Sequence, residues 1–85
     1  MEHVARTPQQ LASILRSWRR RGNLTQQDIA AKVGIKQSTV SVTEADASRA
    51  QVATLYKLLS ALGLELVIRE RASSSTVRGA SGKEW

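Results

Sequence analysis

The sequence predicts a mainly α-helical fold of four to five short helices, followed by one C-terminal strand and a flexible tail. Three observations lead to this class. Apolar residues recur at helical spacing as far as Gly63, capping residues flank most of these stretches, and the apolar period changes to two directly after that glycine. We expect one domain over residues 7–71 and a tail over residues 72–85, which consists mostly of Ser, Gly and Ala.

The first expected helix begins after Thr7, which forms a capping box with Gln10 three residues later. It ends at Gly22, behind a run of three arginines that suits the negative end of the helix dipole. An apolar stripe recurs at positions i, i+3, i+4 and i+7, and we expect its last member, Trp18, to lie in the core. The stripe consists of Leu11, Ile14, Leu15 and Trp18.

Two short helices are expected next, joined by a tight turn. Thr25 and Asp28 form a capping box at the start of the second helix, and Gly34 ends it. The third segment, residues 35–45, is rich in β-branched residues and would by propensity also suit a strand. The break of only two or three residues after the preceding helix favours a helix.

Residues 26–44 have the pattern of a helix-turn-helix. Two helices that cross steeply need a small residue where they touch, here Ala30, and a residue that tolerates a left-handed backbone in the turn, here Gly34. Apolar anchors flank the turn at Ile29, Val33, Ile35 and Val40. An ordinary corner in a helical bundle would satisfy the same packing requirements. Only the exposed residues can therefore distinguish a DNA-binding helix-turn-helix from such a corner.

A further helix covers residues 52–62 and the strand residues 64–69. One apolar face of the helix consists of Val52, Leu55, Leu58, Leu59 and Leu62. The strand "LELVIRE" has an apolar period of two, with Leu64, Leu66 and Ile68 on one face and Glu65, Val67 and Arg69 on the other. Because a lone strand is unstable and the chain offers no second one, we expect it to pair with its copy in a homodimer. The expected dimerisation residues are Leu64, Leu66, Val67 and Ile68.

The basic charge is concentrated in the first half of the chain. The net charge is +6, and residues 1–36 hold seven basic against two acidic residues, whereas residues 37–85 hold six against five. A polyanion is therefore the expected partner of the first half.

The exposed residues of the third segment favour DNA over a simple helical corner. The N-terminal end of the second helix of a helix-turn-helix enters the major groove, where Lys can donate to guanine and Gln can pair with adenine. No acidic residue lies between Lys32 and Thr43. We expect contacts to bases or phosphates from Gln26, Gln27, Lys36, Gln37, Ser38, Thr39 and Ser41. We expect phosphate contacts from Arg16, Arg19 and Arg20.

The sequence argues against an enzyme, a cofactor and a metal site. There is no cysteine, the one histidine lies near the N-terminus, and no nucleophile or phosphate-binding loop accompanies Glu44 and Asp46. We expect these two carboxylates to cap or brace the loop before the last helix. No apolar run reaches membrane-spanning length. The expectation is a soluble cytoplasmic protein associated with the nucleoid and without a membrane partner.

The segments "LTQQDIAAKVGIKQSTVSVTE" and "TLYKLLSALGLELVIRE" and the final "EW" resemble HipB-type antitoxins of the HipBA toxin–antitoxin modules, within the Cro/C1-type (XRE) repressors. The resemblance implies a lambda-repressor-like dimer that binds a palindromic operator, represses its own operon and neutralises a HipA-type serine/threonine kinase toxin. Lys36, Gln37 and Ser38 match the base-reading positions, with Gln27 nearby. Thr43 stands where the family usually has an apolar residue, and Lys36 replaces a common capping Ser.

Trp85, the last residue of the sequence, is unexpected in a small, polar tail. We expect it to enter an apolar pocket on the toxin, with Glu84 pairing with basic groups at the rim, because one buried indole can dominate an interface. The alternatives are that Trp85 folds back on its own domain or that it has no role at this end of the sequence. For the whole chain, the alternatives are a stand-alone XRE-type repressor and a basic protein-interaction module.

Overall fold

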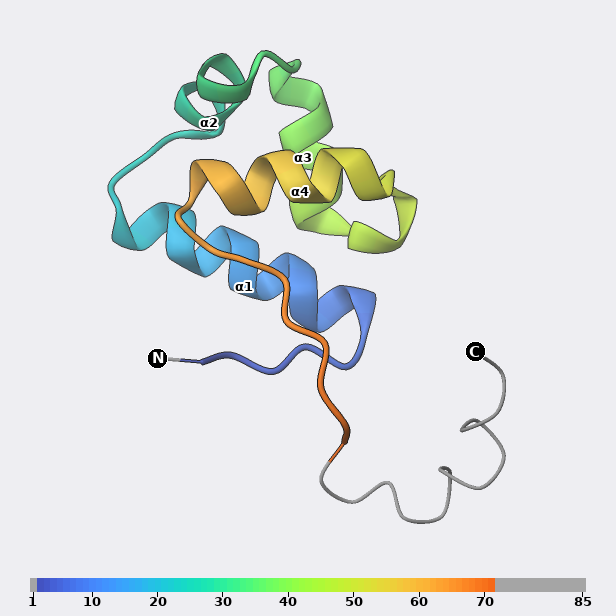
Figure 1. The fold of residues 1–85 in the computed structure, drawn as a ribbon. Helices are drawn as coiled ribbons and strands as arrows, with labels where there is room; N and C mark the ends of the chain where they lie inside the picture. Colours follow the sequence, from blue (N-terminus) through green and yellow to red (C-terminus); the bar gives the residue numbers. More distant parts are fainter. Residues whose placement is uncertain (1, 72–85) are drawn as a thin grey trace.

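The computed structural model describes residues 2–71, and these form four α-helices and one short 3-10 helix (Figure 1). In chain order the elements are α1 (Pro8–Arg21), α2 (Gln26–Val33), α3 (Gln37–Ala45), η1 (Ala47–Arg49) and α4 (Val52–Ala61). This confirms the mainly α class with four to five helices. No helix in the described part of the chain is both long and apolar enough to cross a membrane.

The capping residues begin the first two helices as their chemistry predicts. Thr7 Oγ1 accepts the Gln10 N–H at 3.1 Å, but the Gln10 side chain accepts from Arg6 N–H, so the first capping box does not close on Thr7. The second box is reciprocal. Asp28 N–H donates to Thr25 Oγ1 at 3.0 Å and Thr25 N–H donates to Asp28 Oδ2 at 2.8 Å. Hydrogen bonds from the backbone and the side chain of Thr25 to the Asp28 carboxyl lower the pKa of this group.

Left-handed residues end α2 and α4, and one more follows α1. Gly34 has φ +73° and Gly63 has φ +72°, which glycine adopts without the steric cost of a Cβ atom. After each glycine the chain bonds back to the helix that it has just left, as where Ile35 N–H donates to the Ala30 carbonyl at 3.0 Å. At the end of α1 the left-handed residue is Asn23, with φ +59°, and Gly22 keeps φ −85°.

One apolar core joins the four α-helices. Its buried members are Leu15 of α1, Ile29 and Ala30 of α2, Val40 of α3, and Leu58, Leu59 and Ala61 of α4. Ala30 has no exposed surface, as expected for the small residue between two steeply crossing helices. Because α2 and α3 are each held by this core, the turn between them has a fixed geometry that sets the direction of α3.

Trp18 is not in this core, so the expectation that placed it there is wrong. Ala12 and Leu15 are the buried residues of α1, and Trp18 is half-buried on the flank of the helix. Its ring lies edge-on to the ring of His3, with centroids 5.8 Å apart, and the Arg21 guanidinium lies 4.6 Å from the ring centroid. Trp18 therefore holds the N-terminal arm and a cation rather than filling the centre.

The chain after α4 runs back over α1 towards the N-terminal arm (Figure 1). Arg69 and Glu2 form an exposed ion pair at 3.0 Å. Leu64 packs against the core, but Leu66 is 54%, Val67 63% and Ile68 90% exposed. No strand ladder forms within residues 2–71. Pairing of this segment across a dimer stays a prediction, and Glu84 and Trp85 lie outside the described residues.

Candidate nucleic-acid interface

The exposed end of α3 carries the residues expected to read bases. Lys36 is the N-cap of the helix, and its side chain makes no capping hydrogen bond, so the ammonium group is not tied to the helix end. Lys36, Gln37, Ser38 and Ser41 are exposed, whereas Thr39 is half-buried. Val40 on the opposite side is 1% exposed and anchors the helix in the core. The structure thus presents three adjacent polar side chains at the end of a firmly held helix.

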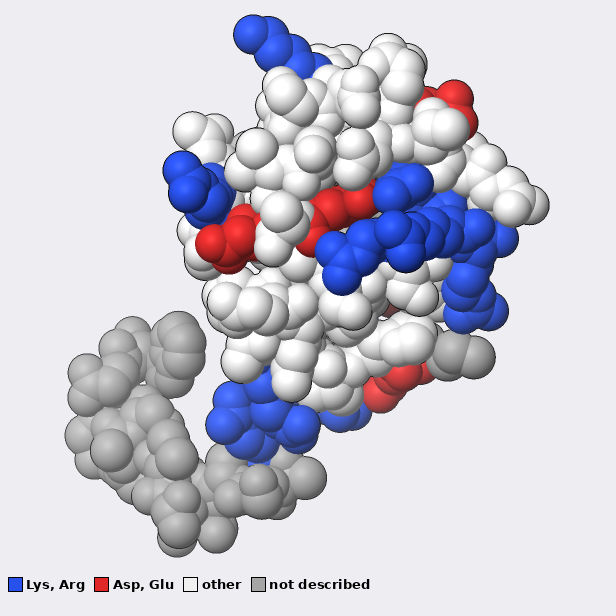
Figure 2. Space-filling view, turned by 180° about the vertical axis from the view of Figure 1, so that it is seen from behind, with Lys and Arg blue, Asp and Glu red and all other residues white. Residues whose placement is uncertain are grey.

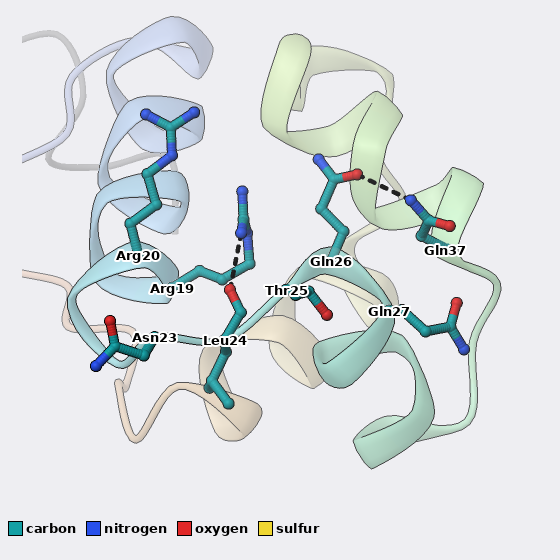
Figure 3. A pocket seen from close by; sticks show the side chains of 8 residues that line it. All are labelled: Arg19, Arg20, Asn23, Leu24, Thr25, Gln26, Gln27 and Gln37. Carbon is teal, nitrogen blue, oxygen red and sulfur yellow. Dashed lines mark hydrogen bonds between the residues drawn. The ribbon is translucent and has the colours of Figure 1, made fainter.

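An open groove of about 540 Å³ lies beside this helix end (Figure 3). It brings together residues from the end of α1, the turn after it, and the first residues of α2 and α3. Its lining consists of Arg19, Arg20, Asn23, Leu24, Thr25, Gln26, Gln27 and Gln37. Five of the ten residues expected to contact DNA therefore share one concave surface: Arg19, Arg20, Gln26, Gln27 and Gln37.

The arginines of α1 divide between the surface and the interior. Figure 2 shows Lys and Arg side chains gathered in a band over α1, next to a mostly uncharged surface over α2 and α3. Arg20 is exposed, whereas Arg16 is half-buried and its Nη1 donates to the Glu44 carbonyl at 2.6 Å. Arg19 is turned inward, with its side chain only 11% exposed.

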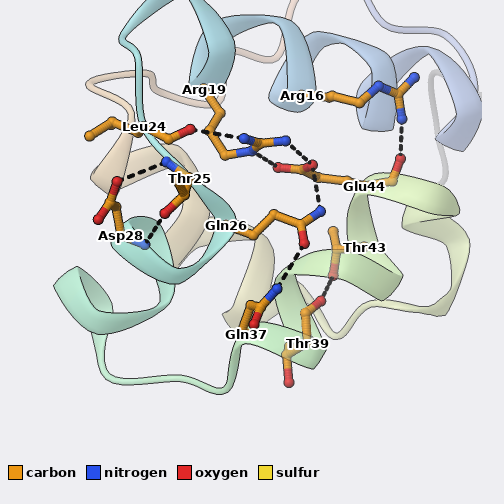
Figure 4. Close-up of polar contacts among 10 residues, drawn as sticks. All are labelled: Arg16, Arg19, Leu24, Thr25, Gln26, Asp28, Gln37, Thr39, Thr43 and Glu44. Atoms are coloured by element: carbon orange, nitrogen blue, oxygen red, sulfur yellow. Dashed lines mark hydrogen bonds and ion pairs between the residues drawn. The ribbon is translucent and has the colours of Figure 1, made fainter.

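Arg19 and Glu44 form a buried ion pair with two contacts (Figure 4). Arg19 Nε donates to Glu44 Oε2 at 2.7 Å and Nη2 donates to Oε1 at 2.9 Å, while Nη1 donates to the Leu24 carbonyl at 2.8 Å. All three guanidinium nitrogens are thus used inside the protein. The structure gives Arg19 a structural role, and the phosphate contacts expected of Arg16, Arg19 and Arg20 stay predictions.

Opposing effects act on the ionisation of this pair. Burial by itself would raise the pKa of the Glu44 carboxyl, but hydrogen bonds from Arg19 and Gln26 and the charges of Arg19 and Arg16 outweigh it, so the pKa of Glu44 is lowered. The hydrogen bond to Glu44 raises the pKa of Arg19 in turn. Both groups are charged at neutral pH.

The polar contacts continue from this ion pair to the surface through Gln26 (Figure 4). Gln26 Nε2 donates to Glu44 Oε1 at 3.1 Å, and Gln26 Oε1 accepts from Gln37 Nε2 at 3.2 Å. Gln26 is half-buried at the first position of α2, and Gln37 is exposed at the first position of α3. The two amides expected to contact DNA independently are therefore bonded to each other.

Thr43 is a polar residue at a position that is usually apolar in the family that the sequence resembles, and the structure shows how its hydroxyl is accommodated. It is 1% exposed, and its hydroxyl donates to the Thr39 carbonyl at 2.9 Å, one helical turn earlier. Because the buried hydroxyl has a hydrogen-bond partner, its burial costs little. The last turn of α3 can therefore pack against the domain despite this polar residue.

The two carboxylates at the C-terminal end of α3, Glu44 in its last turn and Asp46 directly after it, have separate roles. Asp46 caps η1 as expected, accepting from the Ser48 N–H at 3.1 Å, and bonds from Ser48 lower its pKa. Glu44 does not cap the loop but pairs with Arg19, which the sequence analysis missed. Its position four residues after Val40, on the same helix face, was the available signal. Among residues 2–71, no group of three or more His, Cys, Asp or Glu side chains is placed to hold a metal ion.

Comparison with known proteins places this geometry in a family. Residues 15–68 match the model of the Helix-turn-helix family. The chain is 32% identical over 69 residues to the antitoxin HipB of Escherichia coli K12, covering 81% of this chain and 78% of HipB. It is 43% identical over 76 residues to the putative antitoxin HigA2 of Mycobacterium tuberculosis, covering 87% and 75% of the two chains.

Solved structures agree with these sequence matches. A complex of a HipB variant with an O2 20mer superposes with a TM-score of 0.78 at 30% identity, covering 82% of this chain and 97% of that one. HipB in a HipA-HipB-O2-O3 complex superposes with a TM-score of 0.75 at the same identity and coverage. The chain belongs to the Helix-turn-helix family and is a homologue of the HipB antitoxins.

Proposed function

We propose that this protein binds duplex operator DNA as a homodimer, represses its own toxin–antitoxin operon, and binds and neutralises a HipA-type serine/threonine kinase toxin. The observation that carries the proposal is the exposed end of α3, where Lys36, Gln37 and Ser38 stand beside a basic groove. Homologues in complexes with HipA and with O2 support both partners. Such a protein acts in the cytoplasm, on the nucleoid.

In this proposal α3 enters the major groove with its N-terminal end first. Lys36 donates to guanine O6 and N7, and Gln37 bonds to the edge of adenine. Ser38, Thr39 and Ser41 contact bases or phosphates further along the helix. Phosphate contacts that do not depend on sequence come from Gln27, Arg20 and Arg16, because these line or flank the groove without being fully used inside the protein.

The dimer follows from the apolar segment after α4. Leu66, Val67 and Ile68 would remain largely exposed in a single chain, and this surface is buried if residues 64–69 pair with their copy. The two α3 helices would then lie about 34–36 Å apart, one turn of DNA, on a palindromic operator. Sedimentation of the parent chain at micromolar concentration should give a dimer, and Ile68→Lys should give a monomer. A monomeric parent chain contradicts the proposed dimer.

The DNA-binding part is tested with the DNA directly upstream of the protein's own coding sequence. Fluorescence anisotropy should show tighter binding to this duplex than to a shuffled duplex of equal composition, with a steep dependence on salt concentration. Equal affinity for the two duplexes contradicts operator recognition. A reporter under the same upstream DNA should be repressed by the parent chain in cells.

The toxin-binding part rests on Trp85 and Glu84. Co-purification with the product of the neighbouring gene tests whether a kinase-like partner binds at all. Loss of a dominant buried indole costs about 2 kcal/mol, or roughly 30-fold in affinity, so Trp85→Ala should weaken toxin binding by about this factor and leave operator binding unchanged. Glu84→Gln is the milder variant at the same end of the chain, because it removes only the charge that is proposed to pair with basic groups on the toxin. Unchanged toxin binding by Trp85→Ala places the contact on the folded domain instead.

A further inference from the structure

A continuous chain of polar contacts leads from the interior of the domain to the surface proposed to read bases. It starts at Glu44, which is 4% exposed and held by Arg19, passes through the half-buried Gln26, and ends at the exposed Gln37. Three helices are joined by it: α3 contributes both ends, α1 the arginine and α2 the middle amide. The following inference rests on the proposed DNA-binding function.

The ionised carboxylate fixes the direction of every hydrogen bond in this chain. A carboxylate only accepts, so Gln26 has to turn its Nε2 group towards Glu44. The amide of Gln26 then presents its oxygen to Gln37 on the other side. An amide oxygen also only accepts, so Gln37 has to donate through Nε2. No other arrangement of the two amides satisfies both contacts.

This fixed direction decides what Gln37 offers to the solvent. One N–H of its Nε2 group is used by Gln26, which leaves the Oε1 acceptor and one N–H donor. Figure 3 shows the Gln37 oxygen pointing away from Gln26. A free acceptor and a free donor side by side are the pair that the N6 amino group and N7 of adenine require. If the Gln26 amide turned over, the Gln37 amide would turn with it, and donor and acceptor would exchange places.

We propose that Glu44 is a positioning residue for operator readout: through Gln26 it fixes the orientation of the Gln37 amide and thereby the base that Gln37 selects. Glu44 itself does not touch DNA in this scheme. Gln26 acts mainly through Gln37 and not only as a phosphate contact. Specificity at one base pair of each half-site is thus set by a carboxylate in the interior.

The test measures base discrimination, because a purely structural role would not change it. Replacing Gln37 by Ala in the parent chain identifies the base pair at which the preference for the operator is lost. Discrimination at that base pair is the ratio of the dissociation constants of the substituted and the unchanged operator. A fraction of unfolded protein affects both constants equally and cancels in the ratio.

Two variants interrupt the chain at different links. Gln26→Met removes the middle amide with little change of volume and leaves the ion pair of Arg19 and Glu44 in place. Glu44→Gln keeps an oxygen that can accept but adds an amide that can donate, so the direction is no longer fixed. Both should reduce discrimination at the Gln37 base pair by roughly fivefold or more, the lower end of one bidentate base contact. Discrimination at the other base pairs should stay as in the parent.

Gln27→Met is the matched control, because it removes a neighbouring amide of α2 that takes no part in the chain. It should weaken binding to operator and random DNA alike. If Glu44→Gln does not fold, the test of the chain of contacts rests on Gln26→Met, because this variant keeps the ion pair of Arg19 and Glu44. If Gln37→Ala changes no single base preference, the proposed readout by Gln37 is wrong. If Gln37→Ala is selective but Gln26→Met keeps the parent discrimination, the readout stands and this inference is wrong.

Discussion

Arg19 and Glu44 join α1 to α3 through a two-point ion pair between residues 25 positions apart in the sequence. Their side chains are 11% and 5% exposed. The guanidinium also holds the Leu24 carbonyl before α2, so a single side chain ties together both ends of the loop that leads into the helix-turn-helix. The helix that carries the proposed base contacts is therefore fixed to the rest of the domain by charge as well as by the apolar core.

Removing one partner of this pair should destabilise the domain strongly. In Glu44→Ala the Arg19 guanidinium stays buried without its counter-charge, and such a loss costs about 3–5 kcal/mol. That is a large share of the roughly 5–15 kcal/mol by which domains are usually stable. Urea unfolding followed by circular dichroism measures the change. Glu65→Ala removes an exposed acid and should stay within about 0.5 kcal/mol of the parent. A loss below 1 kcal/mol in Glu44→Ala would contradict the structural role.

Stability should fall in acid because the pKa of Glu44 is lower in the folded than in the unfolded state. The unfolded state then binds more protons, so the contribution is complete above about pH 4.3, the ordinary value of a glutamate, and is lost as the pH falls through the lowered pKa. Asp28 and Asp46 act with the same sign. Urea unfolding between pH 3 and 7, roughly the range in which these acids titrate, should give a shallower acid slope for Glu44→Gln. If the free energy of unfolding falls equally steeply with pH in parent and variant, Glu44 does not contribute to the loss of stability in acid.

Lys36→Ala should weaken operator binding and relax the preference at one base pair of each half-site. The ammonium is exposed at the end of α3 and is not used for capping, so it is available for the guanine edge. A good base contact contributes about 1–3 kcal/mol of discrimination. Anisotropy titrations with operators substituted one base pair at a time measure it, and Lys36→Arg should retain part of the preference. An equal loss on operator and random DNA would show that Lys36 contacts only phosphate.

Arg20→Ala should weaken binding to all DNA alike and lower the slope of log K against log salt by about 1 per subunit. Arg20 is exposed in the groove, whereas the Arg19 side chain is used inside the protein. Lys57→Ala removes the same charge from α4 and should leave the slope unchanged. A selective loss on the operator would instead assign Arg20 to base readout.

Gly34→Ala should destabilise the domain by roughly 1–2 kcal/mol through backbone strain, because its φ of +73° is unfavourable for a residue with a Cβ atom. No atom lies within 4 Å of an added Cβ, so steric overlap does not add to the loss. Gly34→Asn should cost less. Gly22→Ala is the control, since Gly22 has φ −85° and its added Cβ would meet Leu24 at an ordinary 3.6 Å. Equal melting temperatures for Gly34→Ala and Gly22→Ala would contradict this account.

The helices could be predicted because their signals are local. Thr25 and Asp28 mark the start of α2, and Gly34 and Gly63 mark helix ends, each through contacts within a few residues. The polar end of α3 could be recognised for the same reason, once the spacing around Gly34 indicated a helix-turn-helix.

The contacts between helices could not be predicted in the same way. The apolar stripe of α1 is wide, so either of its edges could face the core. Packing against α3 and η1 turns Leu15 and Arg19 inward and leaves Trp18 on the flank of the helix. From the sequence, the three consecutive arginines look equivalent at the C-terminal end of α1. In the structure Arg19 points to Glu44, whereas Arg20 points to the groove. The bond between Gln26 and Gln37 depends on how closely the first residues of α2 and α3 approach each other, which the predicted helix-turn-helix does not specify.

The bond between Gln26 and Gln37 also bears on how such a protein can change its target over evolutionary time. A new side chain at position 37 that recognises another base leaves the Gln26 oxygen without its partner, and the Gln26 amide is held in place because its Nε2 donates to the Glu44 carboxylate. On the inference above, we expect retargeting to work best with coordinated replacements at positions 26 and 37. Among related proteins with different operators, these two positions are expected to covary, and libraries that randomise position 37 alone should yield few high-affinity binders.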